Sequence, residues 1–128
     1  MRSPITRELP DGEAGAGVLA ALGDLDGIWG SFVLSGRGDL LLWDVPQEIG
    51  EEALDGVAPR LTRLCQALAR DGRDVELCML RFAQHRLCLR AAGSCTLAVL
   101  TTAAVNVPAL KMAMTVASRR LGQMLMEE

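Results

Sequence analysis

Residues 95–125, CTLAVLTTAAVNVPALKMAMTVASRRLGQML, contain the change of pattern that decides the fold of this 128-residue chain. Residues 96–101 (TLAVLT) are mostly apolar or β-branched, which is typical of a buried strand. Asn106 and Pro108 then interrupt the run. Asn is a preferred helix N-cap because its side-chain oxygen accepts a free backbone N–H, and Pro fits the first helical turn. Beyond them, apolar residues recur at helical spacing and form one stripe: Leu110, Ala113, Met114, Ala117, Leu121, Met124 and Leu125. The stretch predicts a buried strand followed by a capped amphipathic helix.

Length and composition predict one domain with apolar surface to cover. Residues 13–128 are expected to form a single domain, and residues 1–12, which contain two Pro and four charged residues, a flexible N-terminal tail. Half of the residues are hydrophobic and the mean hydropathy is +0.24, so we expect a second copy or a partner to cover part of the surface. The net charge of −3 and the 3 % aromatic content argue against nucleic-acid binding, which uses basic surfaces and stacking rings. No secretory signal or transmembrane segment is expected, and a cytoplasmic location follows.

The groups that could carry catalysis or bind a metal do not form a recognisable constellation. The cysteines Cys65, Cys78, Cys88 and Cys95 include no C-x-x-C pair, and His85 is the single histidine. Each cysteine lies in an apolar run, so we expect reduced core thiols, no metal and no cofactor. Phosphate-binding and dinucleotide-binding glycine motifs are also missing from the sequence. The sequence therefore predicts a protein that is not an enzyme.

The order of the elements predicts an α+β fold. The periodicity favours a helix over residues 13–22, strands over 28–35 and 40–45, a helix over 57–70, and strands over 75–83 and 86–92. Residues 46–56 are expected to form a linker or one loose helical turn. Gln84 and His85 are expected to form a hairpin loop, which pairs Phe82 with Leu87 and leaves His85 solvated at the turn tip. The prediction is a five-stranded antiparallel sheet with three helices packed against it (α-β-β-α-β-β-β-α).

The second helix carries a row of small residues beside its apolar stripe. The stripe expected to face the sheet is Val57, Leu61, Leu64 and Leu68. The neighbouring small row is Ala58, Thr62, Cys65 and Ala69. Such a row can be a tolerant surface, or it can let another helix come close because small side chains shorten the interaxial distance. The residues alone leave both interpretations open.

Three local patterns, in this order and spacing, resemble the Roadblock / dynein light chain family over residues 13–125. Residues 27–34 (GIWGSFVL) resemble the family's first strand, in which Gly, an apolar residue, any residue and Gly precede an apolar run. Residues 97–101 (LAVLT) resemble its fifth strand, and residues 106–110 (NVPAL) resemble its Asn-x-x-x-Leu entry into the last helix. Pro59 departs from the family pattern and is expected to shorten the second helix.

The resemblance implies a longin/profilin-like sandwich that dimerises. In the family, the third strands of two copies pair edge to edge, and the second helices lie together across the joined sheet. Carried to this chain, the pairing edge comprises Val75, Leu77 and Met79. The helix seam comprises Ala58, Thr62, Cys65 and Ala69. A homodimer of this kind would cover the surplus apolar surface and an otherwise open strand edge.

The resemblance also implies a function, namely the regulation or scaffolding of a small Ras-like GTPase by a homodimer. In bacterial relatives, the dimer can activate the GTPase without an arginine finger, by ordering the GTPase's own switch residues. The Ala-, Leu-, Gly- and Arg-rich composition fits a bacterial source. The candidate partner contacts, each equally well explained as solvated helix surface, are Arg60, Arg63, Gln66 and Arg70. The alternatives are an assembly subunit like a dynein light chain and, less favoured because the core positions lack convergent polar groups, a small-molecule sensor.

Overall fold

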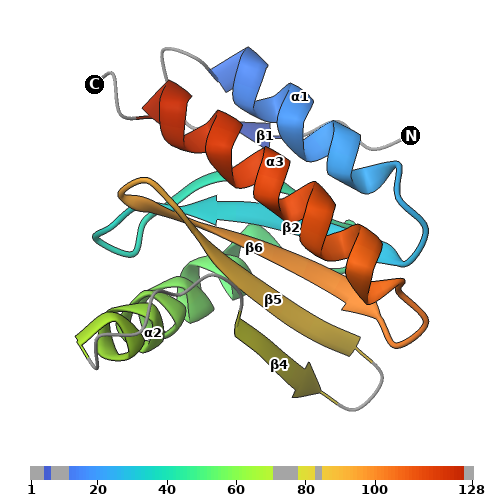
Figure 1. Ribbon diagram of the computed structural model, residues 1–128. Helices are drawn as coiled ribbons and strands as arrows, with labels where there is room; N and C mark the ends of the chain where they lie inside the picture. Colours follow the sequence, from blue (N-terminus) through green and yellow to red (C-terminus); the bar gives the residue numbers. More distant parts are fainter. Residues whose placement is uncertain (1–4, 7–11, 71–77, 83–84, 126–128) are drawn as a thin grey trace.

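The computed structural model is a sandwich in which one antiparallel sheet lies between two helical layers (Figure 1). It describes residues 5–6, 12–70, 78–82 and 85–125. The elements in chain order are β1 (Ile5–Thr6), α1 (Gly12–Gly23), β2 (Ile28–Leu34), β3 (Leu40–Asp44), α2 (Glu51–Arg70), β4 (Cys78–Phe82), β5 (His85–Ala92), β6 (Cys95–Thr102) and α3 (Val107–Leu125). The strands lie in the order β1-β3-β2-β6-β5-β4, and every neighbouring pair is antiparallel.

The sheet formed by the described residues has six strands, so the expected five-stranded sheet is wrong. The additional strand is β1, in which Ile5 pairs with Trp43 and Thr6 with Leu42 along the outer edge of β3. These two residues lie within the segment expected to be a flexible tail. A two-residue strand is too short to show the period-2 alternation by which strands are found in a sequence. Residues 1–4 and 7–11 of the expected tail lie outside the described residues.

Alternating side chains of the strands divide the core into two clusters, one on each face of the sheet. Helices α1 and α3 cover one face, and α2 covers the other (Figure 1). The sheet residues packed under α1 and α3 are Val33, Leu42, Cys88, Leu97 and Val99. Those packed under α2 include Phe32, Leu34, Leu87, Leu89 and Ala98. The alternation within β2, β5 and β6 shows that both faces of the central strands are buried, as the apolar runs in the sequence indicated.

The connection from β6 into α3 follows the predicted chemistry. The Asn106 side-chain Oδ1 accepts the backbone N–H of Ala109 at 3.1 Å, which confirms the predicted N-cap. Gly27, at the entry to β2, has a φ of 89° and accepts the N–H of Thr102 at 2.8 Å through its carbonyl oxygen. A Cβ at Gly27 would lie 2.8 Å from the Cα of Val105, so this crossing of two backbones requires glycine.

Helix α2 begins six residues before the start predicted from the sequence and continues through Pro59. The linker or one loose helical turn expected for residues 46–56 is found only in part: residues 46–50 do lie before the helix, but residues 51–56 are its regular first turns. The expectation that Pro59 shortens the helix is wrong. Glu51 and Glu52 start the helix, where carboxylates complement the positive end of the helix dipole. Leu54, in this additional part, is buried in the core under α2, and this burial favours the longer helix despite the hydrogen bond that proline removes.

The β4–β5 hairpin is offset from its predicted register. Phe82 pairs with His85 and Leu80 pairs with Leu87, so residues 83–84 connect the strands and His85 belongs to β5. The offset is two residues, which leaves the same residues on each face of the sheet. His85 is half-buried, and its ring stacks on Trp29 with 4.3 Å between the ring centroids and 24° between the planes. The expected solvated turn-tip histidine is therefore wrong, because Trp29 reaches it from β2 on the far side of β6.

Candidate functional site

Strand β4 lies at one edge of the sheet and pairs with β5 along one side only among the described residues. Its other side presents backbone N–H and C=O groups to a further strand. Met79, predicted on the pairing edge, lies in β4 opposite Cys88 of β5. Val75 and Leu77, predicted on the same edge, lie outside the described residues. The open edge expected for the third predicted strand is thus found at β4.

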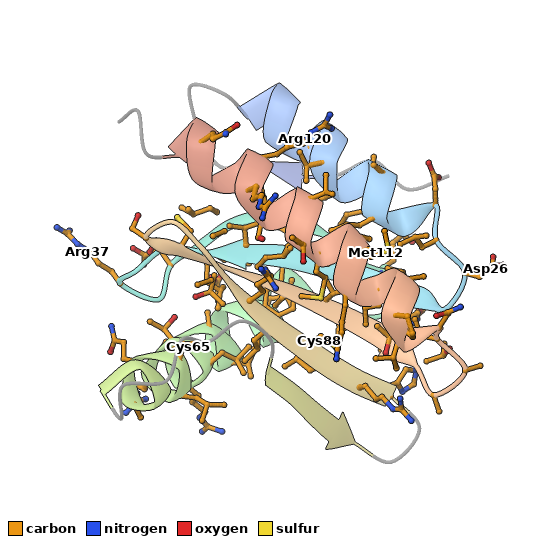
Figure 2. The ribbon with its side chains drawn as sticks, in the orientation of Figure 1. Asp26, Arg37, Cys65, Cys88, Met112 and Arg120 are labelled. Atoms are coloured by element: carbon orange, nitrogen blue, oxygen red, sulfur yellow. The ribbon has the colours of Figure 1, made fainter. Side chains whose placement is uncertain are left out.

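The small row of α2 faces the sheet of its own chain. Ala58 is completely buried and Thr62 is 6 % exposed, whereas Cys65 is half-buried against the same cluster. Figure 2 shows Cys65 on α2 and Cys88 in the sheet. Ala69 lies in the last turn of α2, and its side chain lies outside the described part of the chain. Ala58 therefore offers no surface to a partner, and Cys65 is the described member of the predicted row with the most exposed surface.

The exposed face of α2 combines small residues with basic ones. Arg60, Arg63 and Gln66, predicted as partner contacts, are exposed, while the side chain of Arg70 lies outside the described residues. Ala53, Gly56 and Ala67 share this exposed face, and sequence reasoning missed them. A Cβ placed on Gly56 would contact nothing within 4 Å, so the helix surface is open there. The spacing of four, three and four residues from Gly56 through Arg60 and Arg63 to Ala67 is a helical stripe, which becomes visible once the helix starts at Glu51.

The β2–β3 loop contacts the middle of α2. The Gln66 Nε2 donates a hydrogen bond to the carbonyl oxygen of Gly36 at 3.3 Å. Gly38, with a φ of 91°, lies so close to the helix that a Cβ there would be 3.2 Å from the Cα of Pro59. Arg63 donates from Nε to the Pro59 carbonyl oxygen at 3.4 Å, which holds its side chain along the helix. These contacts hold the exposed face of α2 in place on the rest of the fold.

The acidic and the basic residues of α2 lie in different turns of the helix. Glu51, Glu52 and Asp55 lie in its first turns, and all its arginines follow later. This order complements the helix dipole, and it gives the exposed face an acidic beginning and a basic remainder. A partner that binds the later turns would therefore meet a positive surface.

Neither a metal site nor a membrane span emerges from the described residues. No group of three or more His, Cys, Asp or Glu side chains there could hold a metal ion. Within the same part of the chain, no helix has the length and apolarity needed to cross a membrane. The β4 edge and the exposed face of α2 are the candidate sites considered below.

Comparison with solved structures identifies the fold. A Roadblock/LC7 domain from Streptomyces avermitilis is 20 % identical, with a TM-score of 0.72 over 85 % of this chain and 95 % of that one. The gliding protein MglB from Thermus thermophilus is 17 % identical, with a TM-score of 0.78 over 97 % of both chains. MglB from Myxococcus xanthus is 14 % identical, with a TM-score of 0.79 over 96 % of both chains. No protein-family model and no curated protein matches the sequence.

These similarities show that the chain has the Roadblock/LC7 fold over nearly its whole length, which confirms the resemblance drawn from its three sequence patterns. The particular proteins it is similar to include MglB, one structure of which shows a tetrameric arrangement. At this level of identity, the comparison establishes the fold and nothing finer.

Proposed function

We propose that this chain is a dimeric interaction protein that regulates or scaffolds a small Ras-like GTPase. The observation that carries the proposal is the open edge of β4 together with the exposed face of α2, in a chain with the Roadblock/LC7 fold. Residues that bind another protein need an accessible and well-supported surface. The exposed face of α2 has both properties.

In the proposed homodimer, the β4 strands of two copies pair edge to edge and join the two sheets. Backbone hydrogen bonds would supply this contact, as in other cases of strand addition. Val75, Leu77 and Met79 remain assigned to the pairing edge. The α2 helices then run beside each other, where the small exposed residues Gly56 and Ala67 permit a short interaxial distance.

In the helix seam, Cys65 and Ala69 are assigned to direct contacts. Thr62 and Ala58 pack beneath them against the chain's own sheet, so they support the position of α2 without touching the second copy. The proposed seam therefore consists of the predicted row together with Gly56 and Ala67 on the exposed face of α2.

The GTPase would bind across the paired α2 helices through Arg60, Arg63, Gln66 and Arg70. Guanidinium groups are suited to carboxylates on a partner surface, because their donors form a planar fork. Arg63 is bonded back to Pro59, and Gln66 to Gly36, so both side chains lie along the surface. This geometry favours a platform that orders the GTPase's own switch residues over an arginine that reaches into the nucleotide site.

The test is binding to purified Ras-like GTPases of the source organism, each loaded with GDP or with a non-hydrolysable GTP analogue. We expect tighter binding to the GTP form, and a loss of about tenfold or more in the Arg60→Glu/Arg63→Glu double variant. The Lys111→Glu/Arg119→Glu double variant reverses two exposed charges on α3, in the opposite helical layer; it is the matched charge-reversal control and is expected to bind like the wild type. Acceleration of GTP hydrolysis would identify an activating role, and GTP-selective binding without acceleration an adaptor. Equal binding to the GDP form and the GTP-analogue form would contradict the proposal and favour an assembly subunit.

A further inference from the structure

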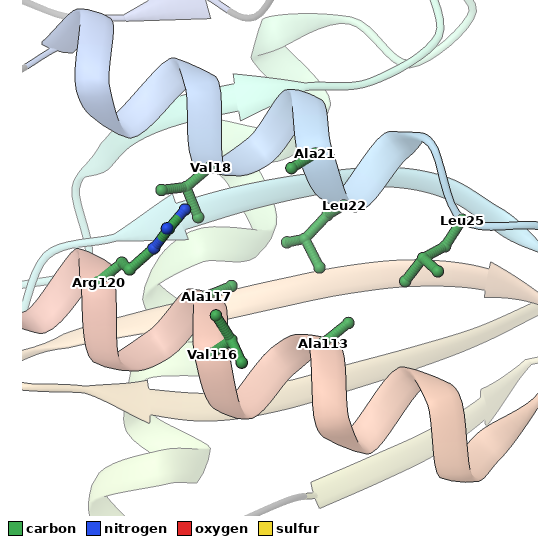
Figure 3. Close-up of a pocket in the computed structure, with 8 residues that line it drawn as sticks. All are labelled: Val18, Ala21, Leu22, Leu25, Ala113, Val116, Ala117 and Arg120. Carbon is green, nitrogen blue, oxygen red and sulfur yellow. The ribbon is translucent and has the colours of Figure 1, made fainter.

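A groove runs along the junction where α1 and α3 pack together, on the face of the sheet opposite α2. Its volume is about 300 Å³, and Figure 3 shows side chains of both helices converging on it. The lining residues are Val18, Ala21, Leu22 and Leu25 from α1 and its following loop, and Ala113, Val116, Ala117 and Arg120 from α3. Apart from Arg120, the lining side chains are aliphatic. Because the groove and α2 lie on opposite faces of the sheet, a partner bound here would leave the proposed GTPase surface free.

Two large apolar side chains are exposed on α3: Val116, which lines the groove, and Met112, one turn before it. Met112 is 73 % exposed and Val116 is 55 % exposed, and they are the exposed large hydrophobic residues of the described chain. Met112, Val116 and Arg120 are four residues apart, so they form one stripe along α3; Figure 2 labels the first and the last of them on this helix. Single exposed apolar residues are ordinary, but an apolar stripe beside an apolar groove is typical of a protein-binding surface.

The α3 side of the groove is positively charged. Lys111, Arg119 and Arg120 are exposed on α3, and α3 contains no acidic residue. Residues 17–22 of α1 carry no charge, but the exposed Asp24 and Asp26 flank the lining residue Leu25 at the end of the groove away from Arg120. Among the described residues, no ion pair or hydrogen bond occupies the side chain of Arg120, which lies at the end of the groove near Val18 (Figure 3). The complementary ligand is therefore apolar along its middle and acidic at one end.

We propose that the groove binds an acidic amphipathic helix of a partner protein. The part of α3 from Ala113 to Arg120 spans about 10 Å at the rise of an α-helix, which matches two turns of a docked helix. Such a helix would place apolar residues at i, i+3 or i+4 and i+7 between α1 and α3. An Asp or Glu one turn further on would pair with Arg120. The small lining residues Ala21, which is exposed, and Ala113, which is half-buried, allow its backbone to come close.

This partner differs from the GTPase in position and in chemistry. The chain would then connect two proteins, one on each face of its sheet. The inference does not depend on the dimer or on the GTPase, because neither β4 nor α2 lines the groove.

The probe is a display library of peptides of about 15 residues, a length at which isolated helices begin to form, with apolar residues and Asp, Glu, Lys or Arg varied at every position. Selection on the full chain should enrich peptides with an apolar i, i+3 or i+4, i+7 stripe followed by Asp or Glu. A synthetic copy of an enriched peptide, added to ¹⁵N-labelled protein, should shift the amides of residues 17–25 and 113–120 and leave those of α2 in place.

The variants Arg120→Glu and Arg119→Glu form a matched pair. Both residues are exposed on α3, but Arg119 lies outside the groove, in a hollow beside Arg90 and Gly122. Arg120→Glu should weaken peptide binding by about tenfold, and a peptide with Lys in place of its acidic residue should restore binding to this variant. Arg119→Glu should bind within about twofold of the wild type, because a rim charge beyond contact distance contributes little.

Three results would overturn the proposal. The first is enrichment of no acidic amphipathic peptide. The second is an equal loss of binding in the Arg119→Glu and Arg120→Glu variants, which would show attraction by net charge alone. The third is that the amide shifts of residues 17–25 and 113–120 appear with vesicles of phosphatidylglycerol and phosphatidylcholine but with no peptide, which would assign the surface to an anionic membrane.

Discussion

The Gly27→Ala variant tests whether the fold requires the first glycine of the sequence pattern at residues 27–34. Gly27 combines a φ of 89° with a position against the Cα of Val105, and its carbonyl oxygen holds the N–H of Thr102 at 2.8 Å. The left-handed backbone alone costs an alanine about 1–2 kcal/mol. The new Cβ would lie 2.8 Å from Val105 Cα, a backbone atom that cannot move aside as a flexible side chain can. Overpacking of this kind costs about 1–3 kcal/mol more.

The free energy of unfolding should therefore fall by about 3 kcal/mol in Gly27→Ala, a large part of the total for a domain of this size. The comparison variant is Gly17→Ala, because Gly17 lies in α1 and a Cβ there would contact nothing within 4 Å. Removing a glycine from a helix without strain should raise the free energy of unfolding by about 0.5–1 kcal/mol. The two substitutions add the same methyl group with opposite effects.

Urea denaturation, followed by circular dichroism, measures both free energies from the midpoint and the slope. The slopes of the two variants should match that of the wild type, so that the midpoints report stability directly. If Gly27→Ala unfolds at the same urea concentration as the wild type, then the backbone crossing of Gly27 and Val105 does not constrain the fold, and the reasoning from these distances fails.

Further substitutions test the cap, the core thiols and the ring stack. Asn106→Ala should lower the free energy of unfolding by about 1 kcal/mol through loss of the cap, and an unchanged midpoint would show that the cap contributes nothing. With a thiol reagent and peptide mapping, Cys65 should react before the buried Cys88; equal fast rates would refute the burial of Cys88. His85→Ala should shift the fluorescence emission of Trp29 to longer wavelength, because the ring that covers one face of the indole is lost. An unchanged spectrum would mean that the stack does not persist in solution.

The sequence predicted the C-terminal part of the sheet and the last helix well, because local chemistry determines them. The capped helix after β6 depends on Asn106, a residue whose side chain acts within its own turn. The hairpin loop between β2 and β3 is likewise local, since Gly38 supplies its positive φ. Patterns of this kind are readable without knowledge of the rest of the chain.

Other features depend on contacts between distant segments. Strand β1 exists through its pairing with β3, and His85 is half-buried through Trp29. Nothing within three or four residues of Ile5 or His85 indicates either contact. The open edge of β4 is also a property of the strand order, which the resemblance supplied and periodicity did not.

Only part of the candidate site on α2 could be predicted from the sequence, because the predicted start of the helix was wrong. With a helix start at residue 57, the row through Ala58 and Cys65 looked like an outer surface. The start at Glu51 adds Leu54 to the buried side and Gly56 to the exposed side, which shows that the row turns toward the sheet. Arg60 and Arg63 were placed correctly on the exposed side of the helix, because charged residues indicate solvent independently of where the helix begins.

The proposed GTPase platform exists only if two copies assemble through β4, so the mass of the chain in solution tests the account most directly. Met79 and Leu80 are successive residues of β4, and in an antiparallel pair successive residues direct their N–H groups to opposite sides of the strand. One of the variants Met79→Pro and Leu80→Pro therefore removes a hydrogen bond to β5, and the other removes an N–H on the open edge.

Light scattering should give the wild type twice the 13.7 kDa mass of one chain. The variant that loses only the outward N–H should have the mass of one chain and the circular dichroism spectrum of the wild type. A wild type that remains at the mass of one chain, or two proline variants that both keep the double mass, would contradict assembly through the edge of β4.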